Sequence, residues 1–291
     1  MLVTLFKCAG RLPLAWLQAV GAALGWLVWW ASPTYRRRFR DHVAQAGVPW
    51  GQAREAVAAA GRMALELPWL WMRPADEPLG PRVRWDGAEH IEHALARGRG
   101  VVFLTPHLGC FEVTAQAYAE RFGAAHGPIT VLYRPPRKAA LRPLAEEARR
   151  RPGLTTAPAT LAGVRQMIRA LRAGQAVGLL PDQVPPEGLG VWSPFFGRPA
   201  YTMTLAARLA QQTGAQVLLA WGERLPGGQG YVVHVSEFQD PLPADDQGES
   251  AAASINHAME RLIRQAPGQY LWGYHRYKAP RREAALLGKD A

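Results

Sequence analysis

One stretch near the middle of the chain, VVFLTPHLGCFEVTAQ at residues 101–116, restricts the possible fold most strongly. Residues 101–105 form a short apolar run between Gly100 and Pro106, which is typical of a buried strand. Residues 111–122 have the apolar spacing of a helix. Strands that alternate with helices indicate an α/β fold, and open α/β sheets bind ligands outside the carboxyl ends of their strands. We therefore expect functional residues just after this strand.

Two polar side chains, His107 and Glu112, lie at the turn between this strand and this helix. Residues five apart on one regular helix point roughly 140° away from each other. The two can face one site only if His107 precedes the helix and Glu112 lies in its first turn, as Pro106 allows. A carboxylate beside a histidine fixes its tautomer and stabilises the imidazolium, so the pair could supply a general base. Taken alone, the spacing is also typical of a loop histidine beside a glutamate that favours the helix dipole.

Residues 12–31 also restrict the possible fold, because these twenty residues contain no charged side chain. A membrane-spanning helix needs roughly 20 apolar residues. Lys7 and Arg11 precede the run, and the stronger basic flank, at residues 36–40, follows it, which predicts that the rest of the chain is cytoplasmic. Three other interpretations stay open: a helix that enters only one leaflet, a cleaved signal peptide, and a buried helix of a soluble protein.

The composition indicates an anionic partner and a membrane. The 291 residues are 48% hydrophobic, enough for one large core, and the net charge is +11. Seven of the 11 Trp lie in the first 71 residues, which favours a membrane over nucleic acid. The basic residues are scattered and no nucleic-acid reader motif is present. Cys8 and Cys110 suggest neither a metal site nor a disulfide, and we expect no metal and no cofactor.

The remaining chain alternates between strands and helices. Strands are predicted at 83–85, 129–133, 176–180, 215–221 and 231–237. Helices are predicted at 50–72, with breaks at Pro68 and Pro74, and at 88–96, 138–150, 161–172, 202–212 and 250–265, with a long Pro/Gly loop at 184–197. This pattern predicts a single α/β domain at residues 41–291, with a mixed, largely parallel central sheet flanked by helices. An N-terminal membrane anchor helix with its basic flank would occupy residues 1–40.

Arg134 and Asp182, like His107, come directly after predicted strands. Taken alone, Arg134 is typical of a charged surface residue, and Asp182 is typical of a residue that caps a turn or a helix. Three polar residues at three strand ends indicate a site more strongly than any one of them.

Five segments carry a resemblance to a known family. They are HLGCFE at 107–112, YRPPRK at 133–138, GLLPDQ at 178–183, GVWSPFFGRPAYTMTLAARLAQQTGA at 190–215 and QYLWGYHRYK at 269–278. In this order they resemble the late acyltransferases of lipid A biosynthesis, and the similarity extends from the apolar N-terminus to about Pro280. The first segment is also shared with glycerol-phosphate acyltransferases, whereas the last two are more specific. Cys110 departs from the Asn that many members have there, which puts the local packing in question.

The resemblance implies a glycerol-phosphate-acyltransferase-like fold and an inner-membrane enzyme that acts on the cytoplasmic face. It would transfer a lauroyl- or myristoyl-like chain from acyl carrier protein to a hydroxyl of the lipid A precursor. His107 would be the general base, oriented by Glu112. Oxyanion stabilisation would come from Arg134 or from backbone amides near residues 108–109. An apolar tunnel would set the chain length.

Further candidate residues would bind substrate groups. Asp182 would hold Arg134 or a substrate group, with Gln183 beside it. Arginine pairs bidentately with phosphate, so lipid phosphates or the phosphopantetheine of the carrier would be bound by Arg134, Arg137, Arg276 and Lys278. Inner-membrane lipids are a further expected partner, and nucleic acid is not.

Two other functions stay open. One is acyl transfer to another lipid acceptor, a glycolipid or a lysophospholipid. The other is a non-catalytic lipid-binding membrane protein, which the presence of both His107 and Glu112 disfavours.

Overall fold

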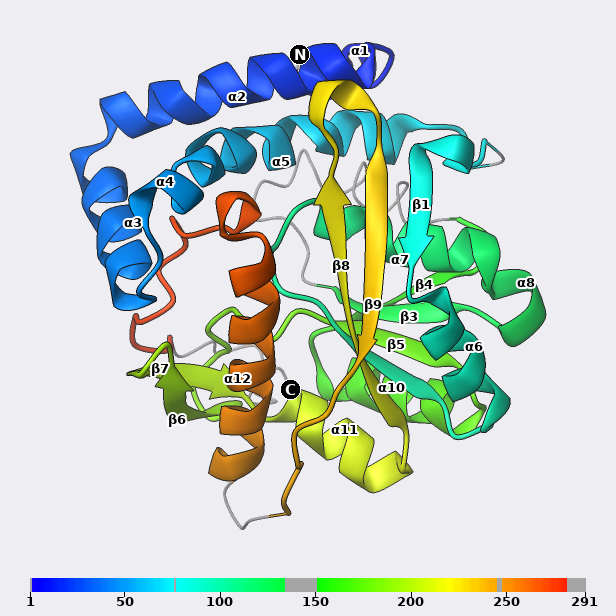
Figure 1. The fold of residues 1–291 in the computed structure, drawn as a ribbon. Coiled ribbons are helices and arrows are strands. Elements are labelled where there is room, and N and C mark those ends of the chain that lie inside the picture. The colour runs from blue at the N-terminus through cyan, green and yellow to red at the C-terminus, as the bar shows by residue number, and fades with distance from the viewer. Residues whose placement is uncertain (1, 76, 134–150, 245–247, 282–291) are drawn as a thin grey trace, which may run out of the picture.

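The computed structural model describes residues 2–75, 77–133, 151–244 and 248–281. A seven-stranded sheet forms its centre, in the order β1-β9-β8-β2-β5-β3-β4. All neighbouring pairs are parallel except β8 and β9. The predicted α/β fold with a mixed, largely parallel sheet is therefore confirmed (Figure 1).

The strands of the sheet are short and mostly buried. Their bounds are β1 (Val83–Asp86), β2 (Val101–Leu104), β3 (Ile129–Tyr133), β4 (Leu154–Pro158), β5 (Ala176–Leu179), β8 (Gln216–Arg224) and β9 (Tyr231–Glu237). All four residues of β2 are buried, as expected for a central strand covered on both faces. A separate hairpin of β6 (Gly190–Phe195) and β7 (Arg198–Met203) occupies much of the region predicted as a Pro/Gly loop.

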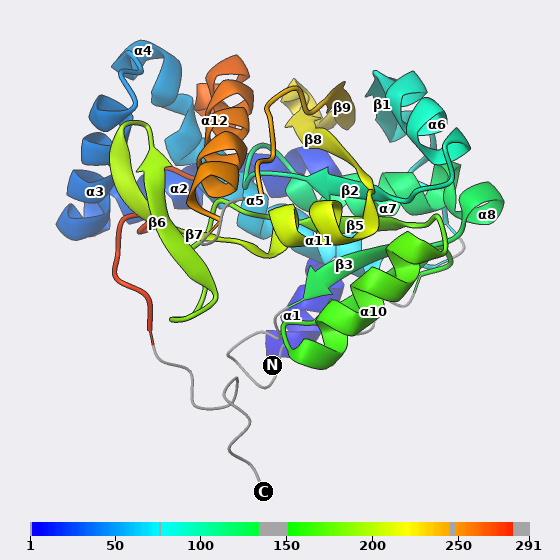
Figure 2. The same cartoon turned by 90° about the horizontal axis from the view of Figure 1, so that it is seen from below.

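Helices cover both faces of the sheet (Figure 2). One hydrophobic cluster joins the sheet to α6 (Ala88–Ala96) and α7 (Phe111–Arg121). A second cluster, on the other face, includes α10 (Leu161–Arg172), α11 (Leu205–Thr213) and α12 (Glu249–Gln265). These helices match the predicted ones to within a few residues. The short α8 (Gly123–His126) leads into β3, and the helix predicted at 138–150 lies outside the described residues.

The N-terminal helices form a layer along one end of the sheet. They are α1 (Leu2–Ala9), α2 (Leu14–Ala31), α3 (Pro33–Gln45), α4 (Trp50–Ala53) and α5 (Glu55–Met72). The predicted break at Pro68 is wrong, because α5 continues through Pro68 to Met72. Its last turn is held by Leu70 and Trp71, which are buried in the core. The expected boundary between the membrane anchor and the α/β domain, after residue 40, falls inside α3.

Helices α2 and α5 are packed at unusually close range. A Cβ atom on Gly61 would lie 1.9 Å from the Gly21 carbonyl oxygen, and one on Gly25 would lie 2.2 Å from that of Val57. Glycine is required at such contacts because any side chain would collide with the neighbouring backbone. Helix α2 is thus an integral part of the fold.

Candidate active site

The residues predicted at strand ends converge at one edge of the sheet. His107 follows β2, and Asp182 and Gln183 follow β5. Strands β2 and β5 are parallel neighbours, with Val101 opposite Ala176, so their carboxyl ends coincide. Strand β3 is the next neighbour of β5 and ends at the same edge. Arg134 and Arg137, which follow β3 in the sequence, lie outside the described residues.

Asp182 holds His107 through two hydrogen bonds. Its Oδ1 lies 2.7 Å from the ring Nδ1 of His107, and its Oδ2 accepts from the His107 backbone N–H at 2.8 Å. The Asp182 side chain is only 2% exposed. Burial disfavours its charged form, but the interactions with His107 outweigh burial and hold the pKa of Asp182 below its ordinary value. A buried carboxylate therefore fixes the imidazole ring.

The second ring nitrogen of His107 contacts Gln183. The Gln183 amide Nε2 lies 2.9 Å from His107 Nε2. An amide nitrogen only donates, so the neutral imidazole carries its proton on Nδ1, toward Asp182, and has its lone pair on Nε2. The Phe111 ring packs against the imidazole with centroids 4.7 Å apart. This arrangement of His107 is suited to a general base.

Glu112 occupies the first turn of α7, as predicted, and lines the same cavity as His107. The indole N–H of Trp71 donates to Glu112 Oε2 at 3.4 Å. The contacts of His107 Nδ1 with Asp182 and of Nε2 with Gln183 favour Asp182 as the carboxylate that orients the imidazole, and the expected role of Glu112 stays a prediction. Both Asp182 oxygens bind His107, and the expected contact of Asp182 with Arg134 or a substrate group stays a prediction, since Arg134 lies outside the described residues.

The backbone after His107 is fixed by the surrounding strands. The amides of Leu108, Gly109 and Cys110 donate to the carbonyls of Pro106, Gln269 and Gly222, respectively. The amides of Leu108 and Gly109 therefore already have acceptors. This argues against the prediction that they stabilise the oxyanion. Gly109 has a φ of +60°, and a Cβ there would lie 2.0 Å from the Gly222 oxygen. Only glycine permits this close contact.

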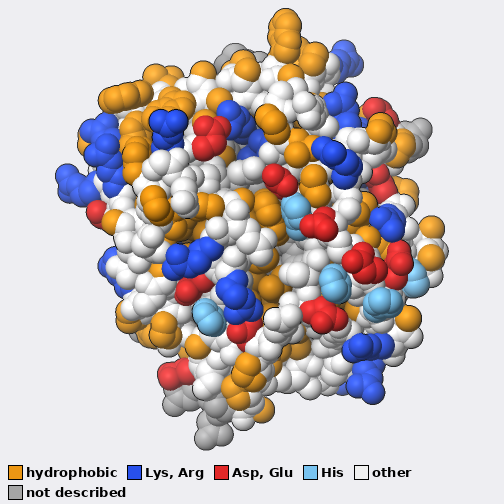
Figure 3. Space-filling model, viewed as in Figure 1, with side chains coloured by type: hydrophobic (Ala, Val, Ile, Leu, Met, Phe, Trp, Pro, Cys, Tyr) orange, Lys and Arg blue, Asp and Glu red, His pale blue; other side chains and the backbone are white. Residues whose placement is uncertain are grey.

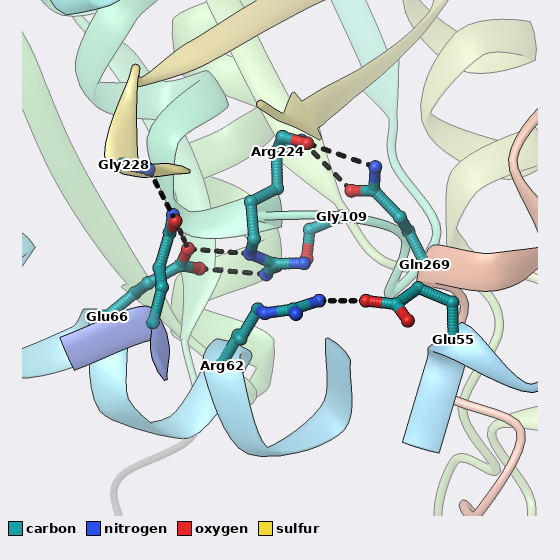
Figure 4. A network of polar contacts seen from close by, with 8 residues as sticks. Glu55, Arg62, Glu66, Gly109, Arg224, Gly228 and Gln269 are labelled. Carbon is teal, nitrogen blue, oxygen red and sulfur yellow. Dashed lines mark hydrogen bonds and ion pairs between the residues drawn. The ribbon is translucent and has the colours of Figure 1, made fainter. Parts of the chain in front are cut away.

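A buried ion pair lies behind this backbone (Figure 4). The Arg224 guanidinium on β8 binds both Glu66 oxygens of α5, with Nε–Oε1 2.6 Å and Nη2–Oε2 2.8 Å. The same Nη2 donates to the Gly109 carbonyl at 3.1 Å. The Glu66 carboxylate also accepts from Gln18 of α2 at 2.8 Å. This network connects the N-terminal helices to the backbone two residues from His107.

Arg276 is not placed to bind a lipid phosphate. Its guanidinium donates to the Tyr201 carbonyl and to Thr202 Oγ1, each at 2.6 Å, and its residue exposure is 2%. The prediction for Arg276 is corrected: its contacts are structural. Lys278 lies with its Nζ 5.0 Å from the centre of the Tyr274 ring, and its role in phosphate binding stays a prediction.

A cavity of about 650 Å³ opens at this site and is mostly apolar. His107, Glu112 and Gln183 line it. Most of its other walls are aromatic and aliphatic side chains, among them Trp71, Phe103, Ile129, Val164, Leu205 and Leu209. Its volume falls within the usual range for small-molecule sites, about 300–1,000 Å³. Such a cavity suits a hydrocarbon chain beside a single reactive group.

The sequence did not reveal the pairing of His107 with Asp182, nor the roles of Trp71 and Arg224. The signal for Asp182 was its place after a strand. Its contact with His107 required the order of strands in the sheet, which the sequence pattern does not contain.

Comparisons with known proteins identify the family. The family model described as bacterial lipid A biosynthesis acyltransferase matches residues 3–279. A lipid A biosynthesis lauroyltransferase of Escherichia coli (strain K12) is 30% identical over 222 residues, 75% of this chain and 68% of the relative. A lipid A biosynthesis palmitoleoyltransferase of the same strain is 26% identical over 213 residues, 73% of this chain and 66% of the relative. The chain belongs to the bacterial lipid A biosynthesis acyltransferase family, and it is an O-acyltransferase.

Proposed function

We propose that this protein transfers a fatty acyl chain from acyl carrier protein to a hydroxyl of the lipid A precursor, at the cytoplasmic face of the inner membrane. Acyl transfer to lipid A is the activity that the family supports. The single observation that carries the mechanism is His107, held between Asp182 and Gln183 at an apolar cavity. This combines a proton acceptor with room for a hydrocarbon chain.

The reaction begins when the acceptor hydroxyl replaces the Gln183 amide at His107 Nε2. The hydroxyl oxygen attacks the thioester carbonyl carbon while Nε2 removes its proton. The Asp182 carboxylate stabilises the resulting imidazolium. The tetrahedral intermediate then collapses, the C–S bond breaks, and the leaving thiolate takes the proton from Nε2. The products are an ester and the free thiol of the carrier.

Glu112 provides a second carboxylate in the cavity that contains the base. A negative charge at this position adds to the stabilisation of the imidazolium. Its hydrogen bond from Trp71 fixes the carboxylate. Arg134, which follows β3, is the proposed oxyanion donor, since the backbone amides of Leu108 and Gly109 have other acceptors. Arg137 and Lys278 remain proposed contacts for phosphate groups.

Charge and hydropathy support the donor and the location. Acyl carrier protein is strongly acidic, and the chain has a net charge of +11. Helix α2 is, within the described residues, the one helix long and apolar enough to cross a membrane. A basic protein with an apolar surface helix is suited to a substrate that resides in the bilayer.

The test is mass spectrometry of the product formed by purified protein, acyl-loaded carrier protein and the tetra-acylated lipid A precursor. We expect an added acyl mass, which identifies the chain transferred, and its loss in His107→Ala with the fold intact by circular dichroism. Substantial turnover by His107→Ala would remove His107 from the base role. No product with any chain length, from a folded protein, would refute the proposed acceptor or donor.

A further inference from the structure

A stripe of exposed apolar side chains follows one face of α2. It consists of Leu12, just before the helix, and Trp16, Val20, Leu24, Leu27 and Trp30. Trp16, Leu27 and Trp30 are 67%, 61% and 70% exposed, respectively. In Figure 3 hydrophobic side chains gather along the edge of the molecule where α2 lies in Figure 1. An apolar stripe of this length on a soluble protein marks a surface that contacts a partner or a membrane.

The opposite face of α2 is committed to the fold. Leu14, Leu17, Gly21, Gly25 and Trp29 are buried there. The glycines allow backbone contact with α5, and at the end of the helix Trp29 stacks on Trp50, with ring centroids 5.3 Å apart. Helix α2 is therefore in contact with the catalytic domain along most of its length.

A polar side chain in the middle of this buried face fixes α2 further. Gln18 donates to Glu66 at 2.8 Å and accepts from the Gly228 amide, at the tip of the β8–β9 hairpin, at 3.1 Å. If α2 crossed the bilayer as an isolated helix, Gln18 would face hydrocarbon and Glu66 would lose a partner. If it crossed in its present packing, α5 would enter with it, including Glu55, Arg62 and Glu66. Charged side chains in the bilayer core are costly.

Basic side chains lie at both ends of the helix. Lys7 and Arg11 are exposed before α2, and Arg37 and Arg40 are exposed on α3 after it. In a spanning helix these two groups would contact head groups of opposite leaflets. In a helix parallel to the membrane they contact one anionic surface, which suits the stripe between them.

We infer that α2 lies in the plane of the membrane: its exposed stripe inserts into the cytoplasmic leaflet and its buried face stays on the catalytic domain. The partner is the surface of a bilayer with anionic head groups. This inference rests on the proposed function, which places the protein at a membrane, and adds the orientation in which the protein binds that membrane. Phe6 of α1 packs on Trp71, a cavity wall residue, with centroids 5.6 Å apart. The leaflet that α2 enters therefore lies next to the active site.

The decisive experiment measures the depth of spin labels in vesicles of phosphatidylethanolamine and phosphatidylglycerol. Labels are attached to Trp16→Cys, Leu24→Cys and Trp30→Cys, each in a Cys8→Ser background, since Cys110 is buried. The first and last positions are 14 residues apart, about 21 Å along a helix. We expect the same shallow depth at all three. A graded depth that passes through the bilayer centre, or three labels that remain in water, overturns the inference.

Charge substitutions give an independent test. We expect Leu27→Glu to weaken binding to these vesicles by roughly tenfold or more, because an acidic side chain is costly in a membrane. Trp192→Glu is the matched control, since Trp192 is exposed on β6, which lies away from α2 in Figure 1, and should leave binding unchanged. Equal binding of Leu27→Glu and the wild type contradicts the inference, as does self-association of the stripe in the absence of vesicles.

Two controls separate this inference from the proposed reaction. His107→Ala should keep the wild-type label depths and lose transfer. Leu27→Glu should retain transfer in detergent micelles, where the bilayer is not needed. Shallow labels without transfer to any lipid would refute the reaction alone, whereas transfer with graded label depths would refute the membrane orientation alone.

Discussion

At the scale of single residues, the molecule gives the two carboxylates near His107 different environments. Asp182 is buried and binds the imidazole Nδ1 at 2.7 Å. Glu112 lines the cavity and is bound by Trp71. A carboxylate on Nδ1 fixes the tautomer that leaves Nε2 free to accept a proton. We therefore propose that Asp182 orients the base and that Glu112 acts on the substrate side.

The first prediction concerns this division of roles. We expect Asp182→Asn to lower kcat by about 10³–10⁴-fold, because an amide at that position permits the wrong tautomer. Glu112→Gln should lower kcat by less, with the imidazole still held by Asp182. Steady-state kinetics of both variants, with thermal melts as the folding control, would check this. A larger effect on kcat from Glu112→Gln would show that Glu112 is the orienting carboxylate in the working enzyme.

The second prediction is the pH dependence of stability. Folding lowers the pKa of Asp182 below its ordinary value of 3.8. The folded state therefore gains stability above pH 3.8 and loses it as the pH falls through the lower, folded pKa. We expect the stability difference between wild type and Asp182→Asn to shrink between about pH 5 and pH 2. Urea denaturation across this range would measure it, and a constant difference would contradict the assignment.

The third prediction separates a structural arginine from one that binds phosphate. Arg276 donates to Tyr201 and Thr202 inside the fold. Removing a buried, hydrogen-bonded charge leaves its partners unsatisfied, so Arg276→Ala should lower the free energy of unfolding by about 3–5 kcal/mol. Where the variant remains folded, KM for the lipid should be close to that of wild type. A large rise in KM without loss of stability would restore a role in substrate binding.

At the scale of elements, close packing of α2 on α5 depends on glycine. We expect Gly61→Ala to reduce stability by about 1–3 kcal/mol, because its Cβ would lie 1.9 Å from the Gly21 oxygen. Gly51→Ala in α4 is the matched control, since no atom lies within 4 Å of the added Cβ. That change should be neutral or stabilising by up to about 1 kcal/mol. Equal unfolding midpoints for both variants would contradict this account.

Most elements could be predicted from the sequence, because buried strands such as β2 are continuous apolar runs and amphipathic helices such as α10 have strong hydrophobic periodicity. The β6–β7 hairpin could not. Pro194 and Pro199 face each other in its register, and proline normally argues against a strand. Strand β4 was also missed, since LTTAP is short, little buried and at the sheet edge.

At the scale of the whole molecule, the Glu66–Arg224 pair connects distant segments of the chain. It joins α5 and β8, contacts the Gly109 carbonyl, and through Gln18 includes α2. The positions of strand ends were predictable, but this network was not, because its members are 158 residues apart and carry no local pattern. The sequence pattern therefore placed His107 and Asp182 at strand ends, and only the tertiary structure revealed the contacts that support them.

The contact between Gln183 and His107 protects the acyl donor from reaction with water. The lone pair that serves as the base is covered by an amide until another donor displaces it. On the proposed mechanism, a water molecule must compete with this amide without the binding energy that a lipid acceptor brings to the apolar cavity. Hydrolysis of the acyl thioester by water is thereby suppressed, and the acyl chain is transferred only after the lipid acceptor has bound.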